Sequence, residues 1–491
     1  MDQSFKNKTI SGVIWKALEN GGNQLIRLVI SIVLARMLDP ANYTTLSLVL
    51  IFINIADIFV KRGFSTSLVQ SMKADNRDFS SVFWASEAIA LALYVVVYFC
   101  APLISRFYEQ TDLTKALRVL SVILMTGAFN SVQTAIITRK FEFRKLCVTT
   151  LGATVFSGVV GIWMAYKGYG IWALVVNQLL GSVAASLLLW LQDRWVPSFV
   201  IDWKRLKQLF GFGWKLMLSD LLNTGYSNLT GLVIGKRFIG DSLAFYNRGN
   251  QYPQMIADNL TSVALAVLFP AYSKKQDDKP LLLEMLRKTN RSTALMVFPT
   301  MAGMAMVATL LMRVLLTEKW VPSAPFLRIL VIVFALYPIE AADLQAINAI
   351  GRSDVYLKTE IIKKIFGILA LCVAVFRFTT PIAIAWSAAI TAVFSLGVTM
   401  IASKKLFTYR YLDQLWDMLP PILLSGAMAV AVWGVSLISM GDLPSLIIQV
   451  VCGVAVYLGL AVLFRLKSLD YLISSIKDYS NRKKSNQPSQ S

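Results

Sequence analysis

Residues 15–43 of this 491-residue chain read WKALENGGNQLIRLVISIVLARMLDPANY, and residues 214–246 read WKLMLSDLLNTGYSNLTGLVIGKRFIGDSLAFY. Each stretch starts with Trp-Lys, continues as an apolar segment interrupted by polar residues, and ends at a turn with an Asp and a later Tyr. Matching polar-interrupted helices in two halves of a chain are typical of transporters whose binding site lies between two lobes. We therefore interpret these stretches as corresponding helices of a duplicated chain.

The composition indicates an integral membrane protein. Hydrophobic residues make up 56% of the chain, charged residues make up 15%, and the mean hydropathy is +0.60. A soluble domain has roughly 25% charged residues, so this much apolar surface needs a lipid environment. The strongly basic net charge of +20 could indicate nucleic-acid binding in a soluble protein, but here it is better explained by the charged ends of membrane helices.

Apolar runs close to the ~20 residues that cross a bilayer recur along the whole chain and predict an all-α, polytopic fold. About fourteen transmembrane helices are expected, with twelve or thirteen as alternatives because the first helix is polar. The predicted spans are 10–37, 42–60, 82–105, 113–137, 146–166, 169–191, 209–235, 243–269, 292–315, 324–349, 358–377, 380–402, 418–439 and 443–465.

The repeat divides these helices into two pseudo-symmetric lobes around a central cavity. We expect an N-terminal lobe at 1–208 with helices 1–6 and a C-terminal lobe at 209–402 with helices 7–12. An additional helix pair, helices 13–14, is expected at 403–476, and residues 477–491 are expected to form a disordered cytoplasmic tail because they are polar.

Basic residues predict that both termini are cytoplasmic. Lys and Arg concentrate in alternate connections, such as 61–77, 139–145 and 274–291, whereas the turn at 39–42 has none. By the positive-inside rule the first set faces the cytoplasm, and the turn at 39–42 faces outward. No cleavable signal peptide is evident.

The residues that could carry chemistry are ionisable side chains within the spans, because a charge in a bilayer is costly. Histidine is absent and the four cysteines are scattered, so neither a metal site nor a cofactor is indicated. The candidates for lining a cavity are Lys16, Glu19, Arg27, Asp57, Lys215, Asp220 and Arg248.

Some of these candidates have a simpler structural interpretation. Lys16 and Glu19 are three residues apart and can form a local ion pair, which leaves a binding role and a structural role open. Arg27 has no acid three or four residues away and needs another partner, water or an anionic substrate. Arg248 lies close to a predicted helix end, where its long side chain could reach water.

Aromatic and small residues are assigned packing roles. Most Trp residues, Trp320 among them, fall near predicted span ends and are expected in an interfacial belt. The Met-rich stretch 296–312 is expected to be lipid-facing or helix-packing surface. Gly231 and Gly235 form a pattern that favours close approach of two helices.

Several short motifs, in this order and spacing, resemble the polysaccharide transporters of the multidrug/oligosaccharidyl-lipid/polysaccharide flippase superfamily. The resemblance covers nearly the whole chain, and within the superfamily the chain is most similar to Wzx-like translocases. The motifs are Lys8-Thr9-Ile10-Ser11-Gly12-x-x-Trp15, Val33-Leu34-Ala35-Arg36-x-Leu38-x-Pro40-x-x-Tyr43, Phe245-Tyr246-Asn247-Arg248, Leu268-Phe269-Pro270-Ala271, Glu318-Lys319-Trp320 and Ala349-x-Gly351-Arg352. One departure is Thr44, where the family usually has Gly after the tyrosine.

The resemblance implies a flippase that translocates undecaprenyl-pyrophosphate-linked oligosaccharide across the bacterial inner membrane by alternating access. Membrane lipids and this lipid-linked oligosaccharide would be its partners, with a polymerase and glycosyltransferases as further candidates. No nucleotide-binding loop is present, so energy would come from a coupling ion, proton or sodium, or from consumption of the substrate on the far side. Cations at mid-membrane, Arg27, Lys16 and Lys215, would attract the pyrophosphate. A cation antiporter on the same fold and a membrane-embedded polymerase are the alternatives.

Overall fold

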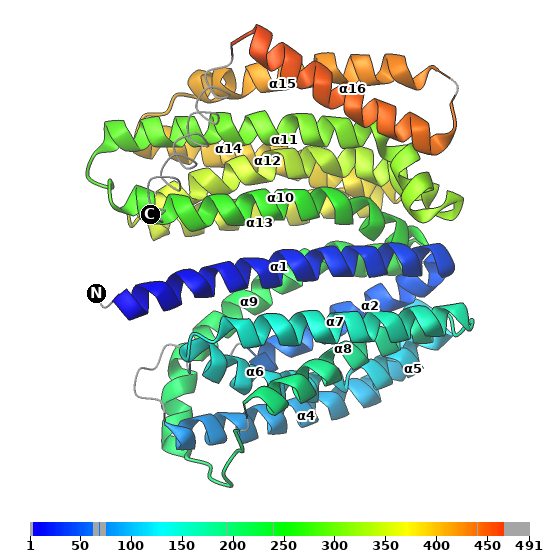
Figure 1. Cartoon of the computed structure of the whole chain (residues 1–491), viewed down its shortest axis with the longest axis vertical. Coiled ribbons are helices and arrows are strands. Elements are labelled where there is room, and N and C mark those ends of the chain that lie inside the picture. Colours follow the sequence, from blue (N-terminus) through cyan, green and yellow to red (C-terminus); the bar gives the residue numbers. More distant parts are fainter. Residues whose placement is uncertain are drawn as a thin grey trace, which may run out of the picture. The chain divides into compact units, whose positions relative to one another are not determined.

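The computed structural model describes residues 3–61, 68, 75–193, 195–238, 240–438 and 440–465. The predicted cytoplasmic tail at 477–491 lies outside these residues. Packing divides the chain into two compact units, residues 1–244 and residues 245–491, and the boundary falls in the first turn of α10. Each unit consists of long helices that lie side by side (Figure 1).

Unit 1 contains eight of the helices found in the described residues. They are α1 (Gln3–Met37), α2 (Pro40–Lys61), α4 (Asn76–Tyr108), α5 (Thr111–Leu120), α6 (Ile123–Arg139), α7 (Phe143–Tyr166), α8 (Ile171–Gln192) and α9 (Trp203–Arg237). The predicted span at 113–137 is thus two helices, α5 and α6, separated by a short turn.

Unit 2 contains seven α-helices and one short 3-10 helix in the described residues. They are α10 (Ser242–Ser273), α11 (Lys279–Leu316), η1 (Glu318–Ser323), α12 (Ala324–Ala349), α13 (Ser353–Arg377), α14 (Ile382–Phe407), α15 (Tyr411–Ser436) and α16 (Asp442–Leu463). Helix α11 packs on α12, α15 and α16, and α14 packs on α12 and α13.

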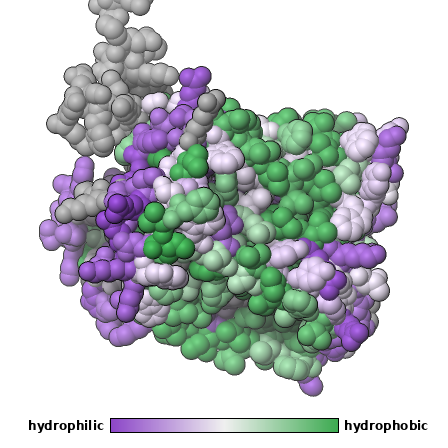
Figure 2. Space-filling model, turned by 90° about the horizontal axis from the view of Figure 1, so that it is seen from below, coloured by the Kyte–Doolittle hydropathy of each residue, from purple (hydrophilic) through white to green (hydrophobic). Residues whose placement is uncertain are grey.

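Ten helical segments in the described residues are long and apolar enough to cross a membrane. Every other predicted span also coincides with a helix, namely α1, α9, α10 or α13, but these four are more polar. An all-α membrane fold is therefore present, and the total of fourteen crossings stays a prediction. The face in Figure 2 carries a broad hydrophobic band with hydrophilic residues toward both ends, as a lipid-facing surface requires.

Carboxylate side chains cap the N-termini of several helices. Asp75 precedes α4 and accepts hydrogen bonds from the backbone N–H groups of Arg77 and Asp78, while Asp78 accepts one from the N–H of Asp75. Asp202 caps α9 in the same way. These caps satisfy the free N–H groups of a first helical turn, and each contributes about 1 kcal/mol.

Two glycines let α9 approach α2 closely, as their spacing predicts. A Cβ atom on Gly231 would lie 2.8 Å from Ile51, and one on Gly235 would lie 2.6 Å from Leu48. Both distances are shorter than real Cβ contacts, so a larger residue at either position would require the end of the Ile51 or Leu48 side chain to move. The close contact positions the rest of α9, which carries Lys215 and Asp220, on unit 1.

Candidate functional site

Six of the seven predicted site residues lie in unit 1, and three of them are on α1. Helix α1 packs along α7 through small and polar side chains. Thr150 donates a hydrogen bond of 3.3 Å to Glu19, and Thr154 donates one of 2.7 Å to Asn23. Gly158 of α7 leaves room for Ile30. Positions 19, 23 and 30 therefore mark the face of α1 that contacts α7.

Lys16 and Glu19 form the local ion pair that their spacing allows. Lys16 Nζ lies 3.0 Å from Glu19 Oε2, and the Glu19 side chain is only 11% exposed whereas that of Lys16 is 47% exposed. The carboxylate therefore has Lys16 and Thr150 as partners. The pair supports a structural role for Glu19 and leaves Lys16 with exposed donors.

Arg27 lies on the same side of α1 as Lys16, about three turns further along the helix. It is exposed, and among the described residues it makes no ion pair or side-chain hydrogen bond. A guanidinium has five N–H donors and stays charged in proteins. Within a membrane helix such a group needs water or an anion, because hydrocarbon offers no hydrogen-bond acceptor.

Helix α9 carries a second cation of this kind. Lys215 is exposed and makes no ion pair or side-chain hydrogen bond within the described part of the chain. Asp220, on the next turns of α9, is half-buried and has an interaction of its own. Lys215 and Asp220 therefore do not form an ion pair with each other within α9.

Asp57 forms an ion pair with a residue of its own helix. Its carboxylate lies 2.9 Å from Lys61 Nζ, one turn along α2. Gly127 of α6 faces this pair, and a Cβ there would lie 3.1 Å from Asp57 Oδ1. The absence of a side chain at Gly127 makes room for the pair. Asp57 and Lys61 therefore form a structural ion pair on α2 where this helix packs against α6.

Arg248 differs from the sequence expectation. It is only 5% exposed, so its side chain does not extend into water from the helix end. It donates a hydrogen bond of 2.6 Å to Gln251, and its guanidinium lies 5.0 Å from the ring centroid of Trp320. Trp320 is itself fully buried, and its ring packs against this guanidinium.

Unit 2 also contains buried charge pairs between helices, and sequence spacing gave no sign of most of them. Lys363 of α13 contacts both Glu340 of α12 and Glu360 of α13. Asp343 of α12 is 1% exposed and accepts hydrogen bonds from Asn290 at 2.8 Å and from a serine hydroxyl at 3.2 Å. These acids therefore have partners.

A third buried group joins α11 to α15. The Asp417 side chain, 2% exposed, accepts hydrogen bonds from Arg287 at 2.8 Å and from Arg291 at 2.5 Å. The Tyr409 hydroxyl donates a further one at 2.6 Å. Hydropathy located the helices, but both arginines are more than a hundred residues from Asp417 in sequence, so no local spacing could have revealed these ion pairs.

An apolar pocket of about 770 Å³ lies within unit 2 between α10, α11, α15 and α16. Its walls include Tyr252, Met296, Gly303, Met428 and Gly453. The Met-rich stretch 296–312, which we expected to be lipid-facing or packing surface, thus forms part of a pocket wall. Methionine side chains are flexible and accommodate apolar ligands of varied shape. The pocket can receive a hydrocarbon chain.

Each unit offers one candidate surface of its own. Unit 1 offers exposed cations on two long polar helices, Arg27 on α1 and Lys215 on α9, and these can bind an anion. Unit 2 offers an apolar pocket that can receive a hydrocarbon chain.

Comparison with known proteins identifies a family and a similar fold. Residues 33–325 match the model of a family described as polysaccharide biosynthesis protein. The chain is 26% identical to the teichuronic acid biosynthesis protein TuaB of Bacillus subtilis, over 94% of this chain and 96% of that protein. It is 22% identical to the succinoglycan biosynthesis transport protein ExoT of Rhizobium meliloti, over 93% and 92%. Its fold is similar to that of the lipid II flippase MurJ in an inward closed conformation, with a TM-score of 0.75, 16% identity and coverage of 92% and 99%.

Proposed function

Because this chain belongs to the polysaccharide biosynthesis protein family, we propose that it is a flippase for undecaprenyl-pyrophosphate-linked oligosaccharide repeat units in the bacterial inner membrane. One observation carries this proposal. The described part of this polysaccharide biosynthesis protein consists almost entirely of helices, joined by short connections, and most of them are apolar enough to span a bilayer. That architecture suits movement of a membrane-bound intermediate, and a polymerase would need an extramembrane catalytic region.

The substrate class follows from the two kinds of surface. The oligosaccharide and pyrophosphate cannot cross hydrocarbon without losing their hydration, which is very costly for a charged group. Exposed cations such as Arg27, with Lys16 and Lys215, attract the pyrophosphate while the head group crosses by alternating access. The apolar pocket of unit 2 receives part of the isoprenoid chain, which stays in an apolar environment throughout.

The proposal also assigns the topology and the lobes. Both termini face the cytoplasm, as the basic connections indicate. The sequence repeat assigns helices 1–6 to residues 1–208 and helices 7–12 to residues 209–402, with an additional pair at 403–476. A coupling ion, a polymerase and glycosyltransferases are proposed partners, and the chain itself is proposed not to be an enzyme.

A cation antiporter is the second candidate, and intramembrane acids are what it requires. Here Asp57 pairs with Lys61 and Glu340 pairs with Lys363, whereas Asp343 is buried and accepts hydrogen bonds from neutral side chains. The contacts of Asp57 and Glu340 favour the flippase, since an antiporter needs acids that are open to a cationic substrate.

Reconstitution into liposomes separates these functions. We expect the protein to expose a fluorescent undecaprenyl-pyrophosphate oligosaccharide on the far side of the bilayer and to leave a cationic dye where it is. Empty liposomes control for spontaneous movement. Transport of the dye without the lipid would instead identify an antiporter, and polymerised oligosaccharide would identify an enzyme.

A further inference from the structure

The connection between α8 and α9 carries large apolar side chains on its outer surface. Val196 is 66% exposed, Phe199 91%, Ile201 47% and Trp203 75%. An apolar patch of this kind on a connecting segment marks a surface that binds a partner or a membrane, because water disfavours it.

The opposite side of the same segment is fixed to the start of α4. Trp195 donates a hydrogen bond of 2.5 Å from Nε1 to Asn76, and the Ser198 backbone N–H donates one of 3.0 Å to Ser80. Trp84 Nε1 donates to the Ser198 carbonyl at 3.0 Å. The segment is therefore held by hydrogen bonds on its inner side and exposes its apolar side chains on the other.

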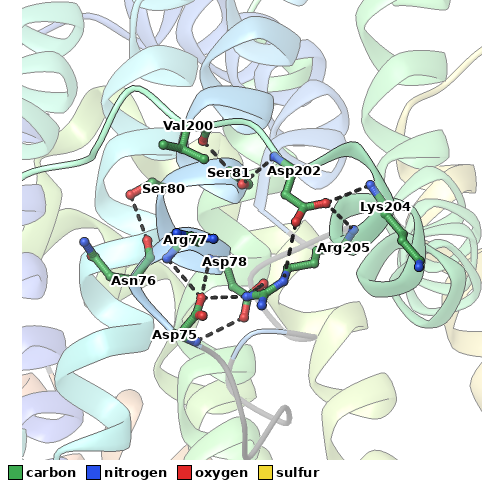
Figure 3. A network of polar contacts seen from close by, with 10 residues as sticks. All are labelled: Asp75, Asn76, Arg77, Asp78, Ser80, Ser81, Val200, Asp202, Lys204 and Arg205. Atoms are coloured by element: carbon green, nitrogen blue, oxygen red, sulfur yellow. Dashed lines mark hydrogen bonds and ion pairs between the residues drawn. The ribbon is translucent and has the colours of Figure 1, made fainter.

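An ionic network extends this attachment to the first turn of α9 (Figure 3). The Asp202 backbone N–H donates to Ser81 at 3.0 Å, and Arg205 lies 2.8 Å from Asp75 and 3.1 Å from Asp78. Leu206 packs in the apolar core beneath α4 and α6. The segment thus has a fixed conformation before any partner binds, which lowers the entropic cost of binding.

The apolar surface continues onto the lipid-facing side of α8. Leu187 and Leu191 are 57% and 72% exposed, and with Trp190 and Val196 they line a recess of about 440 Å³. Past the connection, α9 exposes Lys204 and Lys207. Aromatic and aliphatic side chains next to lysines at the end of a membrane span match the boundary between acyl chains and anionic head groups.

We propose that residues 195–203 form an anchor that binds the membrane interface, with Phe199 and Trp203 among the lipid head groups and Lys204 and Lys207 against anionic phosphates. By the topology proposed above, this is the cytoplasmic leaflet, and the anchor itself does not depend on which lipid the protein transports. It holds the start of α9 at a fixed depth in the bilayer.

Spin labelling of the full-length protein in nanodiscs tests the anchor. Single cysteines at positions 199 and 203, in a variant without the four native cysteines, are compared with one at Gln276, an exposed polar connection of unit 2. We expect labels at 199 and 203 to collide more with O₂, which concentrates in the bilayer, than with a water-soluble nickel chelate. The label at 276 should show the reverse, and Val196→Cys provides a third anchor position if Phe199→Cys does not fold.

Two results would overturn the anchor: nickel access at 199 and 203 equal to that at 276, or low access to both reagents, which would indicate contact with another protein. The lysines are tested with nanodiscs of phosphatidylcholine with and without phosphatidylglycerol. We expect phosphatidylglycerol to increase O₂ access at position 203, and Lys204→Gln with Lys207→Gln to remove that increase. An equal increase in the double variant would overturn the role of the lysines. None of these measurements requires transport, so their failure is distinct from failure of the proposed function.

Discussion

Arg205 contacts the carboxylates of both Asp75 and Asp78, and Asp75 precedes the first residue of α4 and of its candidate span. The hydrogen bond from Arg205 lowers the pKa of Asp75 below its ordinary value, and backbone N–H groups add to this effect. A carboxyl with a lowered pKa stabilises the fold above its unfolded pKa, and that contribution is lost as the pH falls through the folded pKa. The network therefore weakens in acid.

We expect Arg205→Gln to lower the Tm in nanodiscs modestly at neutral pH, and the difference from the parent protein to shrink as the pH falls below about 4. Tm measured across a pH series checks this, with Lys115→Gln as the control because the Lys115 side chain is exposed and lies outside the network. A difference in Tm that stays constant across the series would contradict the role of Asp75.

Arg27 is the residue on which the cationic part of the proposed site depends. We expect Arg27→Ala to abolish export of surface polysaccharide and to leave lipid-linked precursor to accumulate, because the pyrophosphate loses a charged donor. Arg27→Lys should retain part of the activity if charge alone matters, and less if two parallel hydrogen bonds to phosphate are needed. Export and precursor levels in cells are the measurements.

Lys115→Ala is the matched control for Arg27→Ala, since Lys115 is an exposed basic residue of α5. Membrane abundance and Tm of each variant separate loss of function from loss of fold. Normal export by a well-expressed Arg27→Ala, Lys215→Ala double variant would contradict a cationic site.

At the scale of helices, hydropathy located every predicted span but not the polar extensions of the helices. Helix α11 begins at Lys279, whereas hydropathy predicts the start of the span at residue 292. The difference arises because the first three turns of α11 are polar. The split between α5 and α6 was missed since apolar residues continue through it. The Lys16–Glu19 pair followed from helical spacing, but the partners of Asp417 depend on tertiary packing, which no local pattern encodes.

Asp417 ties α15 to α11, and removing it leaves two arginines without their shared carboxylate. We expect Asp417→Ala to lower the free energy of unfolding by about 2 kcal/mol, less than for a fully buried pair because Arg287 and Arg291 are each about a third exposed. Denaturant unfolding in detergent measures this. Glu284→Ala, which breaks an exposed ion pair with Lys288, should have little effect, and equal losses in both variants would contradict the assignment.

Gly303 tests the pocket formed by α10, α11, α15 and α16. A Cβ atom there would contact only Met428, at an ordinary 3.7 Å, so a larger side chain can be introduced without displacing the backbone. We expect Gly303→Leu to narrow the pocket and to lower transport in liposomes about tenfold, equivalent to about 1.4 kcal/mol, and Gly303→Ala to have little effect. Gly397→Leu on α14, which has open space, is the control. Full transport by Gly303→Leu would exclude the pocket as an isoprenoid site.

At the scale of the whole molecule, composition, hydropathy and motif order were sufficient for the membrane class, the fold and the family. The four helices that are too polar or too charged to count among the ten candidate spans include α1, α9 and α10, and these carry six of the seven predicted site residues. The same charges that weaken their signal as membrane segments make them candidates for binding. The polar helices therefore carry both the predicted crossings that hydropathy does not support and most of the predicted binding residues.

The orientation of the whole chain is the remaining prediction, and it depends only on the placement of basic residues. Arg77 at the start of α4 should be cytoplasmic, and Ala41 at the start of α2 should face outward. Both residues are exposed, and Arg77 is preferable to Asn76 because the Asn76 side chain bonds Trp195. We expect an impermeant thiol reagent added to intact cells to label Ala41→Cys, in a variant without the four native cysteines, and to label Arg77→Cys only after the cells are permeabilised. Labelling of position 77 but not of position 41 in intact cells would reverse the topology, and with it the leaflet assigned to the anchor.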